Sequence, residues 1–412
     1  MKKPEDYRFL DPEVQKCPYP FYKLLREEAP IYREPETGYY IVTRHADILE
    51  AKSAPEIFSN NVPITKMGKH TPPEVKEIMA HAYPQPQTLH RTDPPEHTHY
   101  RKVIDRTFTL PRVREMIPYI EGVVRDLMDS FPANGEVDFV TQYAVPLPCM
   151  IIADQLGLPR KDALKLRLWS DGLLDPVGLM VSAEREIECA KLVLEYQNYF
   201  AERIAERQVE PQNDILTSLS QRLEGEAPYT LPEVLNMLEQ IVTGGNESTA
   251  GLVASGLLML IDNPEQQQAL RRDPSRIPNF VEEALRLESP VQSNFRVVKE
   301  DAILGGVEIP KGSLIVLRYG AANRDEACFK DAEQLDINRT DARRHVAFGF
   351  GVHHCPGAML ARQEAISTFQ ELFRRFARFE LTVPRDSLEY HPTFFLRGLE
   401  HLPVRLVAAQ NA

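Results

Sequence analysis

The sequence predicts a mainly helical protein with a small β region. A long apolar segment between Thr230 and Asn263 reads as one buried helix, and most of the remaining chain also reads as helix. Only a few short stretches have the composition of strands. The 33 prolines are spread along the whole chain, and we find no internal repeat and no Gly/Ser linker. We therefore expect residues 1–412 to form one domain.

Composition narrows the classes of protein that remain possible. The chain has 412 residues, of which 43% are hydrophobic and 26% charged, as in a globular protein with a sizeable core. Its net charge of -12 disfavours nucleic acid as a partner and favours proteins or small molecules. Pro4-Glu5-Asp6 follow the first lysines where a secretory signal would be apolar, and no apolar run reaches the ~18 residues of a membrane span. We expect a cytoplasmic protein that does not enter a membrane.

The cysteines are five in number and widely separated, without a Cys-x-x-Cys pair. This pattern argues against a disulfide framework and against a structural zinc site. They are Cys17, Cys149, Cys189, Cys328 and Cys355.

The short strands are expected in three places, namely residues 31–43, 295–298 and 314–317. A Gly/Pro turn at residues 309–312 precedes the last of them. Residues 59–94 are the main irregular segment and hold one short helical candidate after Pro72-Pro73. Because loops of this length are usually functional, we expect the segment to line a ligand site.

The longest helix is expected to begin at the capping box Thr230-Leu231-Pro232-Glu233 and to stop at Pro264. Its length would be on the order of 45 Å. Both flanks are apolar nearly all round, so the helix should cross the interior. Its middle combines two glycines with four polar residues, which predicts a break in a buried helix. That middle reads Gly244-Gly245-Asn246-Glu247-Ser248-Thr249.

The most specific segment places a cysteine where a glycine-rich loop enters a helix. Gly351 and Gly357 let the backbone approach a large flat ligand, and Pro356 suits a first helical turn. The helix dipole and free N–H groups at this end lower the pKa of a cysteine, as a metal-binding sulfur requires. The segment reads Phe348-Gly349-Phe350-Gly351-Val352-His353-His354-Cys355-Pro356-Gly357.

The spacing Phe348-x-x-Gly351-x-x-x-Cys355-x-Gly357 resembles the cysteine-ligand loop of the cytochrome P-450 family. The resemblance implies that Cys355 binds the iron of haem b, with Phe348 and Gly357 beside the cofactor. It also implies the P-450 fold, with the long helix crossing above the haem. The alternatives are a structural cysteine that caps a helix and a zinc site at His353-His354-Cys355, for which no second ligand pair is suitably spaced.

Two further sets of residues resemble the family. His97 and Arg101, four apart on a helix after Asp93-Pro94-Pro95, match positions that bind the haem propionates, as do Arg296 and His353. Each could instead be an ordinary surface or capping residue. Glu283 and Arg286 match a buried structural pair behind the haem; surface ion pairs of this spacing are common. The third partner usually comes from the segment before the ligand loop, where Gln334 stands in place of an arginine.

The middle of the long helix resembles the oxygen-activating stretch of the family. The resemblance implies room for dioxygen at Gly244-Gly245 and a proton relay through Glu247, Ser248 and Thr249. Threonine is usual where this chain has Ser248, and serine lacks the methyl group that restricts χ1. The alternative is simple bonding of the hydroxyl to the carbonyl four residues earlier.

The implied enzyme is a monooxygenase that uses O2 to hydroxylate an apolar small organic substrate. The implied electron donors are a separate ferredoxin and its reductase, with a docking patch at Lys102, Arg106, Arg112, Arg114 and Arg362. A non-catalytic haem-binding sensor and a peroxide-driven peroxygenase are alternatives, and Glu247-Ser248 argues against the second. Candidate substrate contacts are Leu173, Leu174, Val177, Leu179, Met180 and Phe395, with Lys66, Lys69 and His70 for a polar end.

Overall fold

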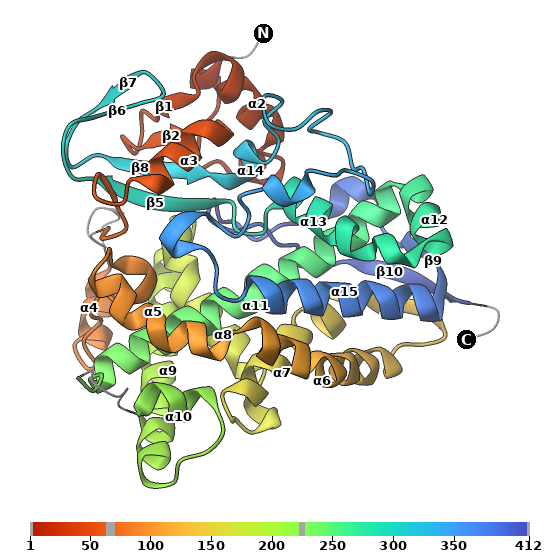
Figure 1. Cartoon of the computed structure of the whole chain (residues 1–412), viewed down its shortest axis with the longest axis horizontal. Coiled ribbons are helices and arrows are strands. Elements are labelled where there is room, and N and C mark those ends of the chain that lie inside the picture. The colour runs from red at the N-terminus through yellow and green to blue at the C-terminus, as the bar shows by residue number, and fades with distance from the viewer. Residues whose placement is uncertain (1–2, 63–70, 222–226, 410–412) are drawn as a thin grey trace.

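A computed structural model of the chain describes residues 3–62, 71–221 and 227–409, in which helices predominate (Figure 1). The helices of the first half are α1 (Pro12–Lys16), α2 (Tyr19–Glu28), α3 (His45–Ser53), α4 (Pro73–Met79), α5 (Glu96–Thr107), α6 (Leu110–Asp129), α7 (Pro146–Gln155), α8 (Lys165–Leu174) and α9 (Ala183–Val209). Those of the second half are α10 (Ile215–Ser220), α11 (Leu231–Asp262), α12 (Pro264–Arg272), α13 (Ile277–Glu288), α14 (Tyr319–Ala322) and α15 (Ala358–Arg375). The prediction of a mainly helical fold with a small β region is confirmed.

The strands form three small sheets. A five-stranded sheet has the order β1-β2-β8-β5-β3, with β2 and β8 parallel and the other pairs antiparallel. Its members are β1 (Ile31–Arg33), β2 (Tyr40–Val42), β8 (Leu314–Arg318), β5 (Ser293–Val298) and β3 (Phe58–Ser59). All three predicted strand regions lie in this sheet. The others are β4 (Asn134–Asp138), β10 (Pro403–Ala408) and β9 (Phe376–Leu381), and the hairpin β6 (Ala302–Leu304) with β7 (Val307–Ile309).

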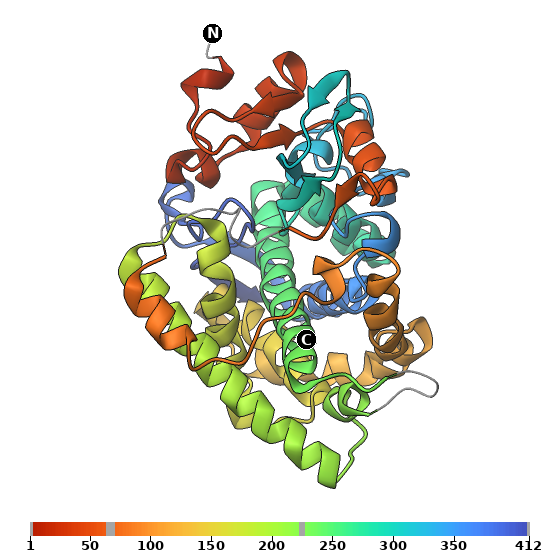
Figure 2. The same ribbon diagram turned by 90° about the vertical axis from the view of Figure 1, so that its left-hand side faces the viewer.

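The long helix α11 runs through the middle of the molecule, as Figure 2 shows. Its capping box is formed as predicted, with the backbone N–H of Thr230 donating to Glu233. Helices α7, α8, α13 and α15 pack around it, and most of its apolar side chains are buried. The predicted break is wrong: the helix is continuous from Leu231 to Asp262. Packing on all sides stabilises a helix whose own sequence is weak at two glycines.

The C-terminal segment closes the fold by returning to earlier parts of the chain. The backbone of Arg397 pairs with Pro290, while its Nη1 donates to the carbonyls of Gln15 and Lys16 at 3.1 and 3.0 Å. Its Nε bonds Glu288 at 3.0 Å. Beyond it, β10 lies between β4 and β9. Within the described residues, no helix is both long enough and apolar enough to cross a membrane.

Candidate active site

The loop before α15 is folded around Cys355. The N–H of Cys355 donates to the carbonyl of Phe348 at 2.9 Å, which closes the loop on itself. Gly349 and Gly351 both have a φ of +71°, a conformation that favours glycine. Helix α15 begins at Ala358, as predicted, and Gly357 is its N-cap, so Pro356 precedes the helix and does not lie in its first turn. The sulfur therefore lies just before a helix N-terminus, where N–H groups are free.

Two neighbouring N–H groups point at the Cys355 sulfur. Burial raises the pKa of the Cys355 thiol, whereas hydrogen bonds from the N–H of Gly357 and Ala358 lower it, together with the charges of Arg101 and Arg362. Because these N–H groups stabilise a thiolate, the thiol can lose its proton when a metal binds the sulfur. By contrast, burial raises the pKa of Cys149 to about 12 and that of Cys189 to about 11.

An ion pair between α15 and α13 supports the loop that contains Cys355. Arg362 on α15 bonds Glu282 of α13 through Nε at 2.8 Å and through Nη2 at 3.1 Å. The same guanidinium lies 4.5 Å from the centre of the Phe348 ring. Arg362 was predicted to belong to a docking patch, but its donors are used inside this network. It therefore positions Phe348 and does not present a free charge to a partner.

Four cationic side chains were predicted to surround the cofactor, and the structure brings two of them into contact. The rings of His97 and His353 lie 4.1 Å apart, and Nε2 of His353 is buried with no hydrogen-bond partner in the described chain. Arg296 is 2% exposed, and within the part of the chain that the structure describes it donates to the Phe295 carbonyl and Asn294 Oδ1. Arg101 differs, because it pairs with Asp105 one turn along α5 at 2.6 Å.

The polar middle of α11 keeps its helical geometry. Ser248 Oγ donates to the Gly244 carbonyl at 2.7 Å, which is the back-bonding alternative that the sequence left open. A side chain at Gly244 would meet no atom within 4 Å, whereas one at Gly245 would lie 3.1 Å from Ile152. Room for a small molecule is therefore present at Gly244 and not at Gly245. Thr249 is buried in the same turn.

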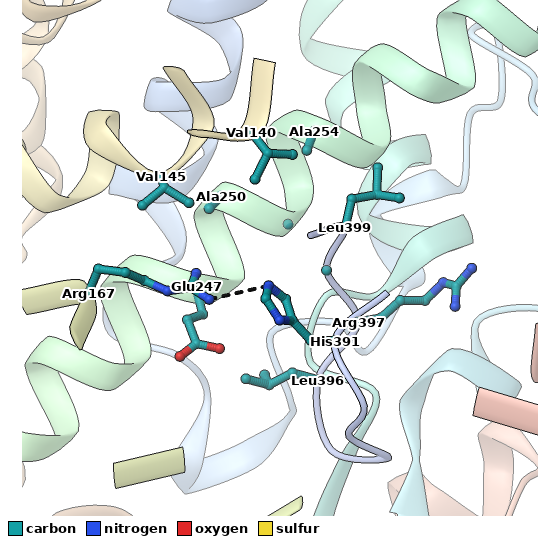
Figure 3. Close-up of a pocket in the computed structure, with 12 residues that line it drawn as sticks. Val140, Val145, Arg167, Glu247, Ala250, Ala254, His391, Leu396, Arg397 and Leu399 are labelled. Carbon is teal, nitrogen blue, oxygen red and sulfur yellow. Dashed lines mark hydrogen bonds between the residues drawn. The ribbon is translucent and has the colours of Figure 1, made fainter. Parts of the chain in front are cut away.

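Glu247 points into a small cavity of about 20 Å³ between α11, α8 and the C-terminal segment (Figure 3). One water molecule fits such a volume. Arg167 of α8 reaches across it and donates from Nη2 to His391 at 3.3 Å, while its Nε pairs with Asp171 at 2.7 Å. Oε1 of Glu247 is buried and has no hydrogen-bond partner among the described residues. This polar cluster was missed from the sequence, because Arg167 and Asp171 of α8, Glu247 of α11 and His391 come from three segments more than 70 residues apart in the chain.

Burial raises the pKa of Glu247 to about 8. The charge of Arg167 lowers the pKa of Glu247, whereas Asp171 raises it through its own charge and through a hydrogen bond between the two carboxyl groups. The pKa of Asp171 is also raised by burial. A carboxyl group with these properties is protonated at neutral pH and can both donate and regain a proton.

The Glu283–Arg286 pair is fully buried, with Nε of Arg286 2.6 Å from Oε1 of Glu283. Its third partner is Arg339, whose Nε lies 3.0 Å from the same oxygen. The suggestion of Gln334 is wrong, since only the backbone carbonyl of Gln334 takes part, accepting from Arg286. The signal in the sequence is Arg339, five residues after Gln334.

Three of the six predicted apolar contacts, Val177, Leu179 and Phe395, lie in one apolar cluster, whereas Leu173, Leu174 and Met180 are not among its members. Leu179 packs with Phe295 and Phe394, and Val177 and Phe395 lie against them. Phe295 and Phe395 have parallel rings with centroids 6.2 Å apart. The predicted polar contacts Lys66, Lys69 and His70 lie outside the described residues.

Comparisons with known proteins agree with this geometry. The model of the cytochrome P450 family matches residues 179–397. Cytochrome P450 107B1 of Saccharopolyspora erythraea is 35% identical over 374 residues, which is 89% of each chain. The vitamin D(3) 25-hydroxylase of Pseudonocardia autotrophica is 33% identical and covers 94% of each chain. The chain belongs to the cytochrome P450 family.

Solved structures support the same conclusion for the fold. Cytochrome P450 CREJ in complex with (4-ethylphenyl) dihydrogen phosphate superposes with a TM-score of 0.88, at 29% identity over 95% of this chain and 98% of that one. Cytochrome P450 CYP109Q5 from Chondromyces apiculatus gives 0.85, at 30% identity over 97% and 98%. The protein is a haem b-dependent monooxygenase of organic substrates.

The residues present fit the haem of this family. In this family the haem iron would be held by a cysteine thiolate, and the two propionates would need cations or hydrogen-bond donors beside them. Cys355 receives two N–H groups, and Arg296 is a buried cation without a carboxylate in ion-pair contact among the described residues. The unpartnered Nε2 of His353 supplies a further polar atom for the rim.

Proposed function

We propose that Cys355 binds the haem iron and that the enzyme hydroxylates an apolar small organic molecule with O2. The loop geometry around Cys355 is the observation that carries this proposal. Phe348 and Gly357 lie beside the thiolate, while His97, Arg296 and His353 bind the propionates, with Arg101 adding positive charge. Haem b with a thiolate ligand supplies the activation of O2, in which one oxygen atom enters a C–H bond and the other leaves as water.

Proton delivery in this proposal depends on α11. Glu247 holds a proton beside the cavity that it shares with Arg167 and His391, and water in that cavity carries it onward. Ser248 accepts a hydrogen bond from water while it donates to Gly244, so its oxygen is fixed in direction. Buried Thr249 shapes the same turn. These groups move protons and limit uncoupled reduction of O2.

An apolar substrate is supported by the cluster around Leu179, Phe394 and Phe395. Two related proteins are named for the organic molecules that they hydroxylate: one is a vitamin D(3) 25-hydroxylase, and another, 34% identical over 316 residues, is the 6-deoxyerythronolide B hydroxylase of Saccharopolyspora erythraea. Electrons would come from a separate ferredoxin and its reductase. The one-domain organisation and the cytoplasmic location stay predictions.

The test is the reduced, carbon monoxide-bound spectrum of the purified protein. We expect the natural protein to show the red-shifted Soret band of thiolate ligation. Cys355→Ala should lack this band. Cys328→Ala, which changes a half-buried cysteine outside the loop, is the matched control and should keep the band. Retention of the band by Cys355→Ala would refute the proposal.

Substrate class is tested separately. Apolar compounds that displace water from the iron should shift the Soret band to shorter wavelength, and the same compounds should stimulate O2 consumption with a reconstituted ferredoxin and reductase. Spectral binding without substrate-dependent O2 consumption would instead indicate a haem-binding sensor.

A further inference from the structure

Lys52 is a lysine buried in the interior, in the last turn of α3. Its side chain is only 5% exposed. The Nζ donates to the hydroxyl of Tyr319 at 3.1 Å and lies 5.5 Å from the centre of the same ring. A neutral phenol orients the ammonium group but does not cancel its charge.

The surroundings of Lys52 carry positive charge and, in the described chain, no carboxylate within ion-pair distance of Nζ. Arg296 is the charged neighbour that affects it most. Burial lowers the pKa of Lys52 well below its ordinary value, and the charge of Arg296 adds to the effect. Buried cations in proteins are paired with an anion, since an unpaired one is costly. Two such cations side by side therefore call for an anionic ligand.

The position of Lys52 relative to the cysteine loop indicates which ligand this is. A Cβ at Gly349 would lie 3.3 Å from Nζ of Lys52 and 3.6 Å from the carbonyl oxygen of His353. A Cβ at Gly351 would lie 3.2 Å from the carbonyl oxygen of Lys52. The glycines of the loop thus allow the lysine to approach closely. The ammonium group therefore contacts Tyr319, lies against the loop that leads to Cys355, and is close enough to Arg296 to be affected by its charge.

We propose that Lys52 binds a carboxylate of the cofactor, one of the two haem propionates, with Tyr319 holding the ammonium group in place. The inference rests on the proposed position of haem at Cys355. It adds a cation from α3 to those expected from α5, β5 and the loop. It also explains why a lysine with no protein carboxylate beside it is buried at this point of the fold.

The experiment measures retention of haem by the loaded protein. Lys52→Gln removes the charge but keeps a donor for Tyr319, and we expect it to transfer haem to excess apomyoglobin about tenfold faster than the natural protein. Lys52→Arg should restore slow transfer. Lys311→Gln changes an exposed lysine and is the matched control, with an unchanged rate. An unchanged rate in Lys52→Gln would overturn the proposal.

A second readout separates binding from a structural role. Removing a cation beside the haem makes the potential of the ferric/ferrous couple more negative, so Lys52→Gln should shift it downward while Lys52→Arg does not. Tyr319→Phe keeps the charge and should leave the potential nearly unchanged. Equal haem loss in Tyr319→Phe and Lys52→Gln, without a shift of potential, would show a structural hydrogen bond and overturn the inference.

Failure of a Lys52 variant to load haem is also informative. If Lys52→Gln yields no loaded protein, loading of Lys52→Arg supports the proposal and failure of both variants overturns it. The Soret band of the reduced, carbon monoxide-bound protein distinguishes failure of the Lys52 proposal from failure of the proposed function at Cys355. Variants at Lys52 should keep the thiolate band, whereas loss of the band in the natural protein would refute the role of Cys355 itself.

Discussion

Ser248 is a small residue in a position that controls a proton. Its hydroxyl donates to the Gly244 carbonyl, which leaves the oxygen lone pairs free to accept from water. Serine holds χ1 less tightly than threonine, because it lacks the γ-methyl group. The direction of the hydroxyl therefore depends on this one hydrogen bond.

For Ser248→Ala we expect reducing equivalents to be consumed at a similar rate, with product per electron pair lowered about tenfold and peroxide increased. Ser248→Thr keeps the hydroxyl and should retain or improve the yield. Product and peroxide are measured in the same reaction. An unchanged yield in Ser248→Ala would remove Ser248 from the relay.

Glu247 should impose an alkaline limit on turnover. Its pKa is raised to about 8, so the carboxyl group is protonated at neutral pH and loses its proton as the pH rises through about 8. Turnover that needs this proton should fall over the same range. Glu247→Gln should lower turnover about a hundredfold and abolish this pH dependence.

Asp171→Asn tests the cause of that limit. Asp171 raises the pKa of Glu247, so its replacement should move the alkaline limb to lower pH. The exposed Asp105→Asn on α5 is a control that should leave the limb in place. A pH–rate profile identical in Asp171→Asn and the natural protein would contradict the coupling.

At the scale of elements, the contact between α13 and the segment before the ligand loop depends on one carboxylate. Glu283 accepts from Arg286 and lies against Arg339, and the backbone N–H of Asp336 also donates to it. Arg339 in turn bonds the carbonyls of Lys330 and Asp331. The segment is thereby fixed by charge at a site that water does not reach.

Arg339→Met should destabilise the protein by about 3 kcal/mol, because a buried charge loses a partner. Arg343→Met removes an arginine that is 77% exposed in its pair with Glu282, and should cost less than about 1 kcal/mol. Denaturant unfolding of both variants measures the difference. Equal stabilities would show that Arg339 adds nothing to the buried pair.

The sequence was most informative where the structure depends on local rules. The capping box at Thr230 and the loop into α15 follow from a few adjacent residues, and both were predicted. The continuity of α11 was not, because it depends on packing that the two glycines do not reveal. Arg339 and the cluster of Arg167, Asp171 and His391 depend on contacts between distant segments. Such contacts have no local pattern.

At the scale of the whole molecule, exposed apolar side chains lie around the ligand loop, namely Phe350, Val352 and Met359. Leu110, the first residue of α6, is also exposed. Apolar residues with a basic rim are typical of a docking surface. Arg106 and Arg114 are exposed, whereas Arg362 is engaged with Glu282.

We expect reduction by a ferredoxin-type donor to slow as ionic strength rises, and Arg106→Glu to lower its rate about tenfold at low salt. Arg378→Glu reverses an exposed charge on β9 and is the control. Stopped-flow absorbance follows the reduction. A rate that does not respond to salt would mean that the basic residues only increase solubility.

The pairing of β10 with β4 has a consequence for how the polypeptide is made. Val404 lies opposite Val137, so β4 leaves the ribosome about 265 residues before its partner. At the usual speed of synthesis the interval is roughly 13 to 50 s. During that time Val137, the buried apolar residue of β4, lacks its partner strand, and a nascent chain with such an uncovered segment is a substrate for chaperones. Additional chaperone during synthesis should therefore raise the yield of intact enzyme.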